Sequence, residues 1–408
     1  MRLRPPSVQP LAAPPPLRVR LDRAILVRSL AILGVVFYHA CTGPYGASAA
    51  FQSAIALFGA SAGHSAQAMA AALPSFDRLV SIFFLVAGYF AHRAFQRSRA
   101  KNPGGSLRAF VRFFLWRRFF LLVPAFWAAL LFSYFVSYDR PFSWDGARQL
   151  IVNASLLKTL CPGYFFSINH AHWFVAAQWQ LDLLYPLFLV VVLRRSMEFA
   201  VAAAWTLAFA VLFVLPHFST ATFVTNFPLR WVAEWTLGAY LAHRHLAGRR
   251  LFPSRAIAFA LVGVACVAGS FPAEWEWLVL RLALATAFEL LLLSRSPRRR
   301  WERALAPVGG CSYALYLLHI PLQTLVGRAG RALGVEFNTP AAWLAFVVVS
   351  TALSLQVARW TTLHIEQRSV ALGNRLWRRR WHIRGWWHDP EAPLLQPIRW
   401  IKKEAGGA

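Results

Sequence analysis

Residues 24–43 read AILVRSLAILGVVFYHACTG, an apolar run long enough to cross a bilayer as a helix. A hydrocarbon core about 30 Å thick requires about 20 apolar residues in helical conformation. Similar runs recur along the rest of the chain. The sequence therefore predicts about ten transmembrane helices, over residues 24–43, 78–96, 113–137, 172–193, 198–216, 229–243, 255–271, 275–294, 309–328 and 341–362.

The composition supports a membrane protein. Of 408 residues, 58% are hydrophobic and only 14% are charged, whereas a soluble globular protein carries about 25% charged residues. We therefore expect an all-α, polytopic integral membrane protein rather than a soluble enzyme.

The positive charge predicts the orientation of the protein in the membrane. A net charge of +27 on one folded face would suggest a nucleic-acid partner. Here the basic residues lie between apolar runs, so we predict no nucleic-acid partner and interpret them as topology signals. With the N-terminus in the cytoplasm, 33 of the 43 Lys and Arg residues fall on the cytoplasmic side. We predict a multi-pass protein of the bacterial inner membrane with both termini cytoplasmic.

Three regions follow from the distribution of apolar residues. Residues 1–23 are rich in Pro and Arg and predict a disordered cytoplasmic lead. Residues 24–362 form the transmembrane domain. Residues 363–408 are basic and Trp-rich, which predicts a cytoplasmic tail on the membrane surface, with lipids as partners. The apolar stretch 51–73 predicts a partly helical outer loop.

The cysteines exclude several chemistries. The four cysteines show no CxxC spacing, so we predict no zinc, iron–sulfur or thioredoxin-like site and no bound metal. Cys41 and Cys161 are both predicted on the oxidising outer side, where a disulfide can form. The alternative is that Cys41 is buried as a small apolar residue.

Two polar residues in the first span indicate a functional site. Arg28 and His39 are eleven positions apart, which places both on one face of a helix. Polar groups inside a span are costly and are functional candidates by default. The alternatives are that Arg28 extends to the membrane surface and that His39 makes a structural hydrogen bond. The shared face favours a site.

Other polar residues in the spans have two interpretations. Gln178 and Asp182 lie in a span with many polar positions, which predicts a face that lines a cavity. His319 is predicted to make a structural hydrogen bond. Interhelical ion pairs explain the remaining charges at least as well as catalysis does; these are Glu234, Arg281, Glu289 and Arg359.

Several motifs in order make residues 21–368 resemble the integral-membrane acyltransferase family 3. The family pattern of a basic residue, ten positions and a histidine matches Arg28 and His39. The other matching segments are IFFLVAGY (82–89), WRRFFLLVP (116–124), HWFVAAQWQLDLLYP (172–186), SYALYLLHIP (312–321) and HIEQR (364–368), the last only at Glu366.

The sequence departs from the family pattern at three places. Ala87 stands where serine is usual, and Leu121 stands where a further arginine is common. Gln178 stands in the place of an acid. The Leu121 and Gln178 departures bear on donor binding and proton handling.

The resemblance implies acyl transfer to a hydroxyl of a periplasmic or cell-surface glycan. His39 would be the general base, with an acyl-imidazole intermediate as the alternative. Arg28, Arg117 and Arg118 would bind the phosphates of an acyl-CoA donor; positive-inside anchoring is the other explanation for Arg117 and Arg118. The acceptor-binding or cavity-lining candidates are Trp173, Gln178, Asp182, Tyr185 and His319.

The resemblance also implies the substrates and partners. Acetyl-CoA or succinyl-CoA would be a donor substrate, and no cofactor would be permanently bound. The long first outer loop is similar to that of the branch that succinylates periplasmic glucans. Association with polysaccharide synthesis or export machinery is a further expectation. Two other functions fit charged spans: a transporter or flippase, and a non-catalytic partner of a polysaccharide synthase.

Overall fold

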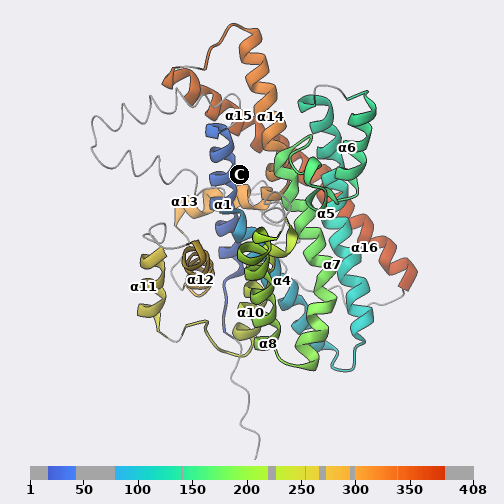
Figure 1. The fold of residues 1–408 in the computed structure, drawn as a ribbon, viewed down its shortest axis with the longest axis vertical. Coiled ribbons are helices and arrows are strands. Elements are labelled where there is room, and N and C mark those ends of the chain that lie inside the picture. The colour runs from blue at the N-terminus through green and yellow to red at the C-terminus, as the bar shows by residue number, and fades with distance from the viewer. Residues whose placement is uncertain are drawn as a thin grey trace, which may run out of the picture.

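The computed structural model describes residues 17–42, 79–138, 141–218, 227–252, 254–265, 273–294, 299–337 and 339–381. Within these ranges all regular secondary structure is helical, and the helices form a bundle (Figure 1). The predictions for residues 1–16, for the loop 51–73 and for the tail beyond residue 381 fall outside the described residues.

A helix lies at each of the predicted spans, because each apolar run satisfies its backbone hydrogen bonds internally. These helices are α1 (Leu21–Thr42), α4 (Val80–Lys101), α5 (Leu107–Ser137), α7 (Trp173–Arg194), α8 (Met197–Phe209), α10 (Val232–Leu246), α11 (Arg255–Ala265), α12 (Ala273–Leu292), α14 (Ser312–Ala332) and α15 (Pro340–Thr361). Outside the predicted spans, the described residues also form α6 (Trp144–Ala154), α13 (Arg300–Gly310) and α16 (Gln367–Trp381).

The described helices establish a multi-pass membrane protein. Five segments are long and apolar enough to cross a membrane: Leu21–Cys41, Leu107–Ser137, His170–Arg194, Met197–His217 and Pro340–Arg379. Helices α13 and α14, bent by 73°, form a sixth if they are taken as one span. Helix α10 has only 15 residues and α11 only 11, too short to meet the same test. The count of ten and the sides of the termini remain predictions.

Helices α4 and α10 pack with their backbones in direct contact. A Cβ atom on Gly88 of α4 would overlap the carbonyl oxygen of Trp235, and one on Gly238 of α10 would overlap that of Leu85. Small residues allow this close approach, which is a common way for helices to associate in membranes. The two glycines therefore set the spacing of this helix pair.

Two polar contacts join α10 to α12. Glu234 pairs with Arg281 at 2.7 Å, and His245 Nε2 lies 2.9 Å from the Glu289 carboxylate. All four side chains are buried. The prediction of interhelical ion pairs is therefore confirmed for the Glu234–Arg281 pair, and Glu289 has a buried partner in His245. Arg359 lies on an exposed part of α15.

The bend between α13 and α14 brings the start of α14 beside α1. The bend falls at Cys311, between the last residue of α13 and the first of α14. Arg28 of α1 donates a hydrogen bond to Ser312 Oγ at 2.6 Å, and Ser29 Oγ donates to the Leu305 carbonyl at 2.8 Å. Two consecutive helices, α13 and α14, are thereby held against a helix that lies about 280 residues earlier in the chain.

The last helices continue through the predicted domain boundary at residue 362. A π-helical turn, Thr362–Glu366, joins α15 directly to α16. Helix α16 packs on α5, where Trp116 Nε1 donates to the Gly373 carbonyl at 2.9 Å. Trp377 is buried against the Phe113 ring rather than facing a lipid headgroup.

The cysteines that the structure describes are free thiols. Cys41 is buried and Cys161 is partly exposed, and no disulfide joins them. Of the two interpretations for Cys41, the structure favours burial as a small apolar residue.

Candidate functional site

Arg28 and His39 lie near opposite ends of α1 and open into different cavities. Eleven residues of helix separate them by roughly 16 Å along the axis. Arg28 lines one cavity, which we call the arginine cavity. His39 lines a second cavity, which we call the histidine cavity. The shared helix face therefore connects two sites rather than forming a single one.

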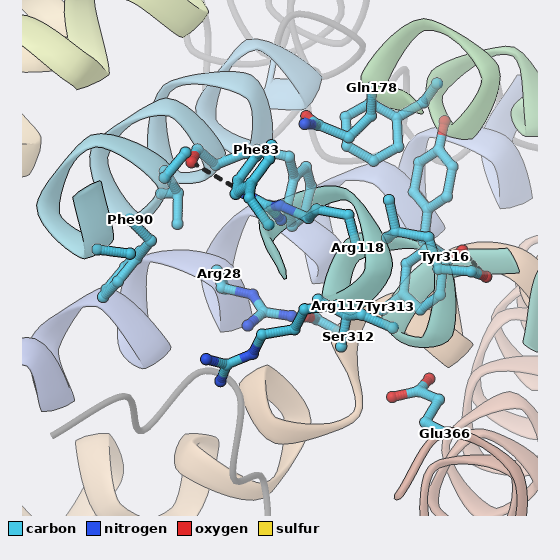
Figure 2. Close-up of a pocket in the computed structure, with 18 of the residues that line it drawn as sticks. Arg28, Phe83, Phe90, Arg117, Arg118, Gln178, Ser312, Tyr313, Tyr316 and Glu366 are labelled. Atoms are coloured by element: carbon cyan, nitrogen blue, oxygen red, sulfur yellow. Dashed lines mark hydrogen bonds between the residues drawn. The ribbon is translucent and has the colours of Figure 1, made fainter. Parts of the chain in front are cut away.

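The arginine cavity, of about 170 Å³, combines cations with an apolar wall (Figure 2). Arg28, Arg117 and Arg118 line it together, as the family resemblance implies for donor binding. Its apolar walls come mainly from phenylalanine and alanine side chains of α4 and α5. A cavity with this lining suits a ligand with an anionic head and a chain that packs against apolar walls.

Arg118 is held in place from several sides. Its Nε lies 3.5 Å from the buried Asp182 carboxylate, and its guanidinium carbon lies 5.2 Å from the centre of the Phe114 ring. Its terminal nitrogen donates to the Ala87 carbonyl at 3.3 Å. Asp182 therefore orients an arginine of the cavity and does not itself line either cavity.

Sequence reasoning did not assign two residues of the arginine cavity. Glu366, on the π-helical turn, is only 5% exposed and lines the cavity with Arg28. Ser312 accepts the hydrogen bond from Arg28. Both residues occur in segments that match the family pattern, which was the available signal. The Ser312 hydrogen bond and the position of Glu366 in the cavity of Arg28 depend on helix packing that the sequence does not reveal.

The histidine cavity is larger, about 670 Å³, and is rich in aromatic residues. Trp173 and Trp231 both line it, with their rings stacked at a centroid distance of 5.2 Å. Arg230 lies over the Trp231 ring at 4.6 Å, and Glu276 adds an acid to the wall. Aromatic side chains beside charged ones are suited to a polar ligand with apolar faces, such as a sugar.

Tyr316 belongs to the walls of both cavities. Its ring lies 5.1 Å from Phe174 and 6.3 Å from Phe83, and these two phenylalanines line the arginine cavity. The three side chains form an aromatic partition, which we define as Phe83, Phe174 and Tyr316. The cavities are therefore neighbours, with this partition at their boundary.

A chain of hydrogen bonds fixes the tautomer of His39. His319 Nδ1 lies 2.8 Å from the Tyr316 carbonyl and 3.2 Å from the Leu315 carbonyl, so this nitrogen must carry the hydrogen. In a neutral His319, Nε2 is then an acceptor, and it lies 3.0 Å from His39 Nδ1. His39 Nδ1 must therefore be the donor, which leaves the His39 Nε2 lone pair available as a base.

His170 completes the group around His39. Its ring centroid lies 5.0 Å from that of His39, as does the ring of His319. His170 lines the histidine cavity, whereas His319 is fully buried and lines neither cavity. Among the described residues, no group of three or more His, Cys, Asp and Glu side chains could hold a metal ion.

His319 is predicted to act as a positioning residue for His39. His319→Phe removes the acceptor and should lower kcat roughly ten-fold, the value of one hydrogen bond, with the donor KM unchanged. His319→Gln offers a carbonyl oxygen to the His39 Nδ1 hydrogen and should restore most of the rate. Steady-state kinetics of the two purified variants test this role. Equal losses in both variants would contradict it.

The remaining predicted residues occupy different places. Trp173 lines the histidine cavity, as expected for an acceptor residue. Gln178 instead lines the arginine cavity. Tyr185 is buried in the core, with its hydroxyl 3.3 Å from the Ala91 carbonyl, and lines neither cavity.

Lys158, which sequence reasoning missed, anchors the segment between α6 and α7. It is fully buried and donates to the carbonyl oxygens of Ser167 and Asn169 at 3.1 and 2.9 Å. The Tyr316 hydroxyl donates to the Ala171 carbonyl of the same segment at 2.7 Å. The segment that carries His170 is thus fixed both to its own lysine and to α14. A lone lysine in a polar loop gives no sequence signal for such burial.

The stability of the protein is expected to rise with pH because of Lys158. Burial lowers the pKa of Lys158 to about 7. Between this value and the ordinary lysine pKa, the unfolded chain holds a proton that the folded chain has released. The free energy of unfolding should therefore rise by up to about 1.4 kcal/mol per pH unit in that window. Thermal melting in detergent at pH 7 and pH 9 measures this rise. Lys158→Met should lose it, and an equal rise in the variant would contradict the assignment.

The apolar helices and the two adjoining cavities define a multi-pass membrane protein with a candidate transfer site inside its bundle. A family model described as an acyltransferase domain matches residues 21–359. The match covers most of the chain, so the protein belongs to acyltransferase family 3 and is a membrane acyltransferase. No curated protein and no solved structure gave a match.

Proposed function

We propose that the protein transfers an acetyl or succinyl group from cytoplasmic acyl-CoA to a hydroxyl of a periplasmic or cell-surface glycan. The observation that carries this proposal is the arrangement along α1. Arg28 lines one cavity, His39 lines the other, and Tyr316 is a wall of both. Donor and acceptor would thus occupy neighbouring sites.

The arginine cavity would hold the donor. Arg28, Arg117 and Arg118 offer charge-assisted and bidentate hydrogen bonds to the phosphates of CoA. The apolar walls would accompany the slender pantetheine arm toward the aromatic partition. An extended CoA can span the distance from Arg28 to the neighbourhood of His39, so the nucleotide need not cross the membrane.

The histidine cavity would hold the glycan. The aromatic side chains of its wall, Trp173 and Trp231, and the charged Arg230 and Glu276 would contact the apolar and polar parts of a sugar. His39 Nε2 would take the proton of the acceptor hydroxyl as its oxygen attacks the thioester carbonyl. The carbon–sulfur bond of the tetrahedral intermediate then breaks, and the His39 imidazolium returns the proton to the leaving CoA thiolate. The products are one ester and one free thiol.

The proposed location is the bacterial inner membrane, with the arginine cavity facing the cytoplasm. Acyl-CoA is available on that side, and surface glycans are available on the other. Membrane lipids and the machinery of polysaccharide synthesis or export are the proposed partners.

A reaction with labelled donor tests the function. Purified protein is incubated with acetyl-CoA or succinyl-CoA labelled in the acyl group, together with a glycan extract of the host. We expect the label in the glycan fraction and an equal amount of free CoA thiol. A transporter or a non-catalytic partner would release no thiol, and that result with both donors would overturn the proposal.

A further inference from the structure

Gln178 presents a buried amide to the arginine cavity, and the amide oxygen has no hydrogen-bond partner among the described residues. Its side chain is 3% exposed and lines the cavity. Its Nε2 faces the carboxylate of Asp182, one helical turn later, which also lies 3.5 Å from Arg118 Nε. Figure 2 shows Gln178 on the wall of the pocket, apart from Arg28 and Arg117.

A buried amide of this kind indicates a ligand. Most buried polar side-chain atoms in proteins have a partner, because an unpaired one loses its bonds to water and gains none in return. Gln178 leaves one acceptor, its Oε1, without a bond on the wall of the cavity. A ligand that offers an N–H or O–H donor would satisfy this atom.

The position of Gln178 indicates which kind of ligand group it contacts. Gln178 follows Phe174 by one turn of α7, and the Phe174 ring contacts Tyr316 at 5.1 Å. It therefore lies at the end of the cavity bounded by the aromatic partition. The guanidinium groups already supply the charge for phosphates, so a neutral amide adds recognition of a neutral polar group. The pantetheine arm of CoA contains such groups, in the form of two amides.

We propose that Gln178 binds an amide of the pantetheine arm of the acyl-CoA donor. This assignment rests on the proposed function, because it names the part of the donor that lies against one residue of the same cavity. Gln178 then helps to determine how far the arm enters, and so where the thioester stops relative to Tyr316 and His39. It is a donor-binding residue rather than an acceptor-binding one.

Titration of purified protein with two ligands tests the assignment. The ligands are CoA and adenosine 3′,5′-bisphosphate, which carries phosphates of CoA but lacks the pantetheine arm. Gln178→Met keeps the volume of the side chain and removes both polar atoms. We expect it to weaken CoA binding roughly ten-fold, about 1.4 kcal/mol, and to leave binding of the bisphosphate unchanged. The unchanged bisphosphate affinity also shows that the variant is folded.

Two further variants serve as controls. Gln180→Met removes an amide that bonds to Thr159 and Leu156 and lines neither cavity, so it should leave both affinities unchanged. Arg28→Ala should weaken both ligands, because both carry phosphates. Unchanged CoA binding in Gln178→Met, or equal weakening of both ligands, would overturn the assignment of Gln178 alone. Failure of the wild-type protein to bind either ligand would overturn the proposed function, and the assignment with it.

Discussion

His39→Ala is expected to abolish acyl transfer while leaving CoA binding close to that of the wild-type protein. His319 Nε2 accepts the hydrogen of His39 Nδ1, which leaves the His39 Nε2 lone pair available as the base. General-base catalysis contributes roughly 10²- to 10⁴-fold to such reactions, so the residual rate should be lost in the background. Transfer is measured with labelled acyl-CoA and glycan, and CoA affinity by calorimetric titration.

The reverse pattern is expected for Arg28→Ala. Loss of a hydrogen bond to a charged group costs about 1.5–3 kcal/mol, so CoA should bind at least ten-fold more weakly. Transfer at saturating donor should then recover much of its rate. Neither substitution opens a large apolar cavity, so both proteins should fold.

Substantial transfer by His39→Ala would show that the proposed mechanism is wrong even though the family assignment holds.

Gly88→Ala and Gly238→Ala are each expected to prevent normal packing of α4 against α10. The added methyl group would overlap a backbone carbonyl oxygen of the other helix, and backbone cannot rotate away as a side chain can. The helices must separate along their length, with loss of the contacts beside the glycines. We expect little monodisperse protein on size-exclusion chromatography and a melting temperature several degrees lower for what remains.

Gly263→Ala is the matched control for these two variants. Gly263 also lies in a helix, α11, and among the described residues no atom of another part of the chain lies within 4 Å of the Cβ position. Alanine favours helix over glycine by up to about 1 kcal/mol, so this variant should be as stable as the wild-type protein or slightly more so. Normal yield and melting behaviour for Gly88→Ala would contradict the close contact of α4 and α10.

The sequence predicted the helices well, because each span is a long apolar run with its own internal hydrogen bonds. It did not predict which helices pack together. The close approaches of Gly88 to Trp235 and of Gly238 to Leu85 join residues about 150 positions apart, and neither segment contains a pattern that identifies the other as its packing partner. The same limit applies to the continuation of α15 into α16. Residue 362 marks a change from apolar to basic composition, but the helix itself continues through it.

The sequence predicted that Arg28 and His39 belong to the candidate site, but it did not predict the contacts that surround them. Arg28 and His39 follow from the cost of polar groups in a membrane and from helical periodicity. The tautomer of His39 depends on His319, which is 280 residues away, and on carbonyl oxygens that composition cannot locate. Gln178 was expected among acceptor or cavity residues, and the direction in which it faces assigns it to the arginine cavity. Such contacts come from tertiary packing and not from any local pattern.

The aromatic partition bears on the electrical potential and the pH difference across the membrane. With donor and acceptor on opposite sides, as proposed, the Tyr316 ring is part of the barrier between two compartments. These compartments differ in electrical potential and in pH. The acyl group must pass this point, while protons and small ions must not. The Tyr316 hydroxyl donates to the Ala171 carbonyl at 2.7 Å, which holds the ring at the boundary between the two cavities. On this proposal, the same ring must keep protons and ions from crossing between turnovers.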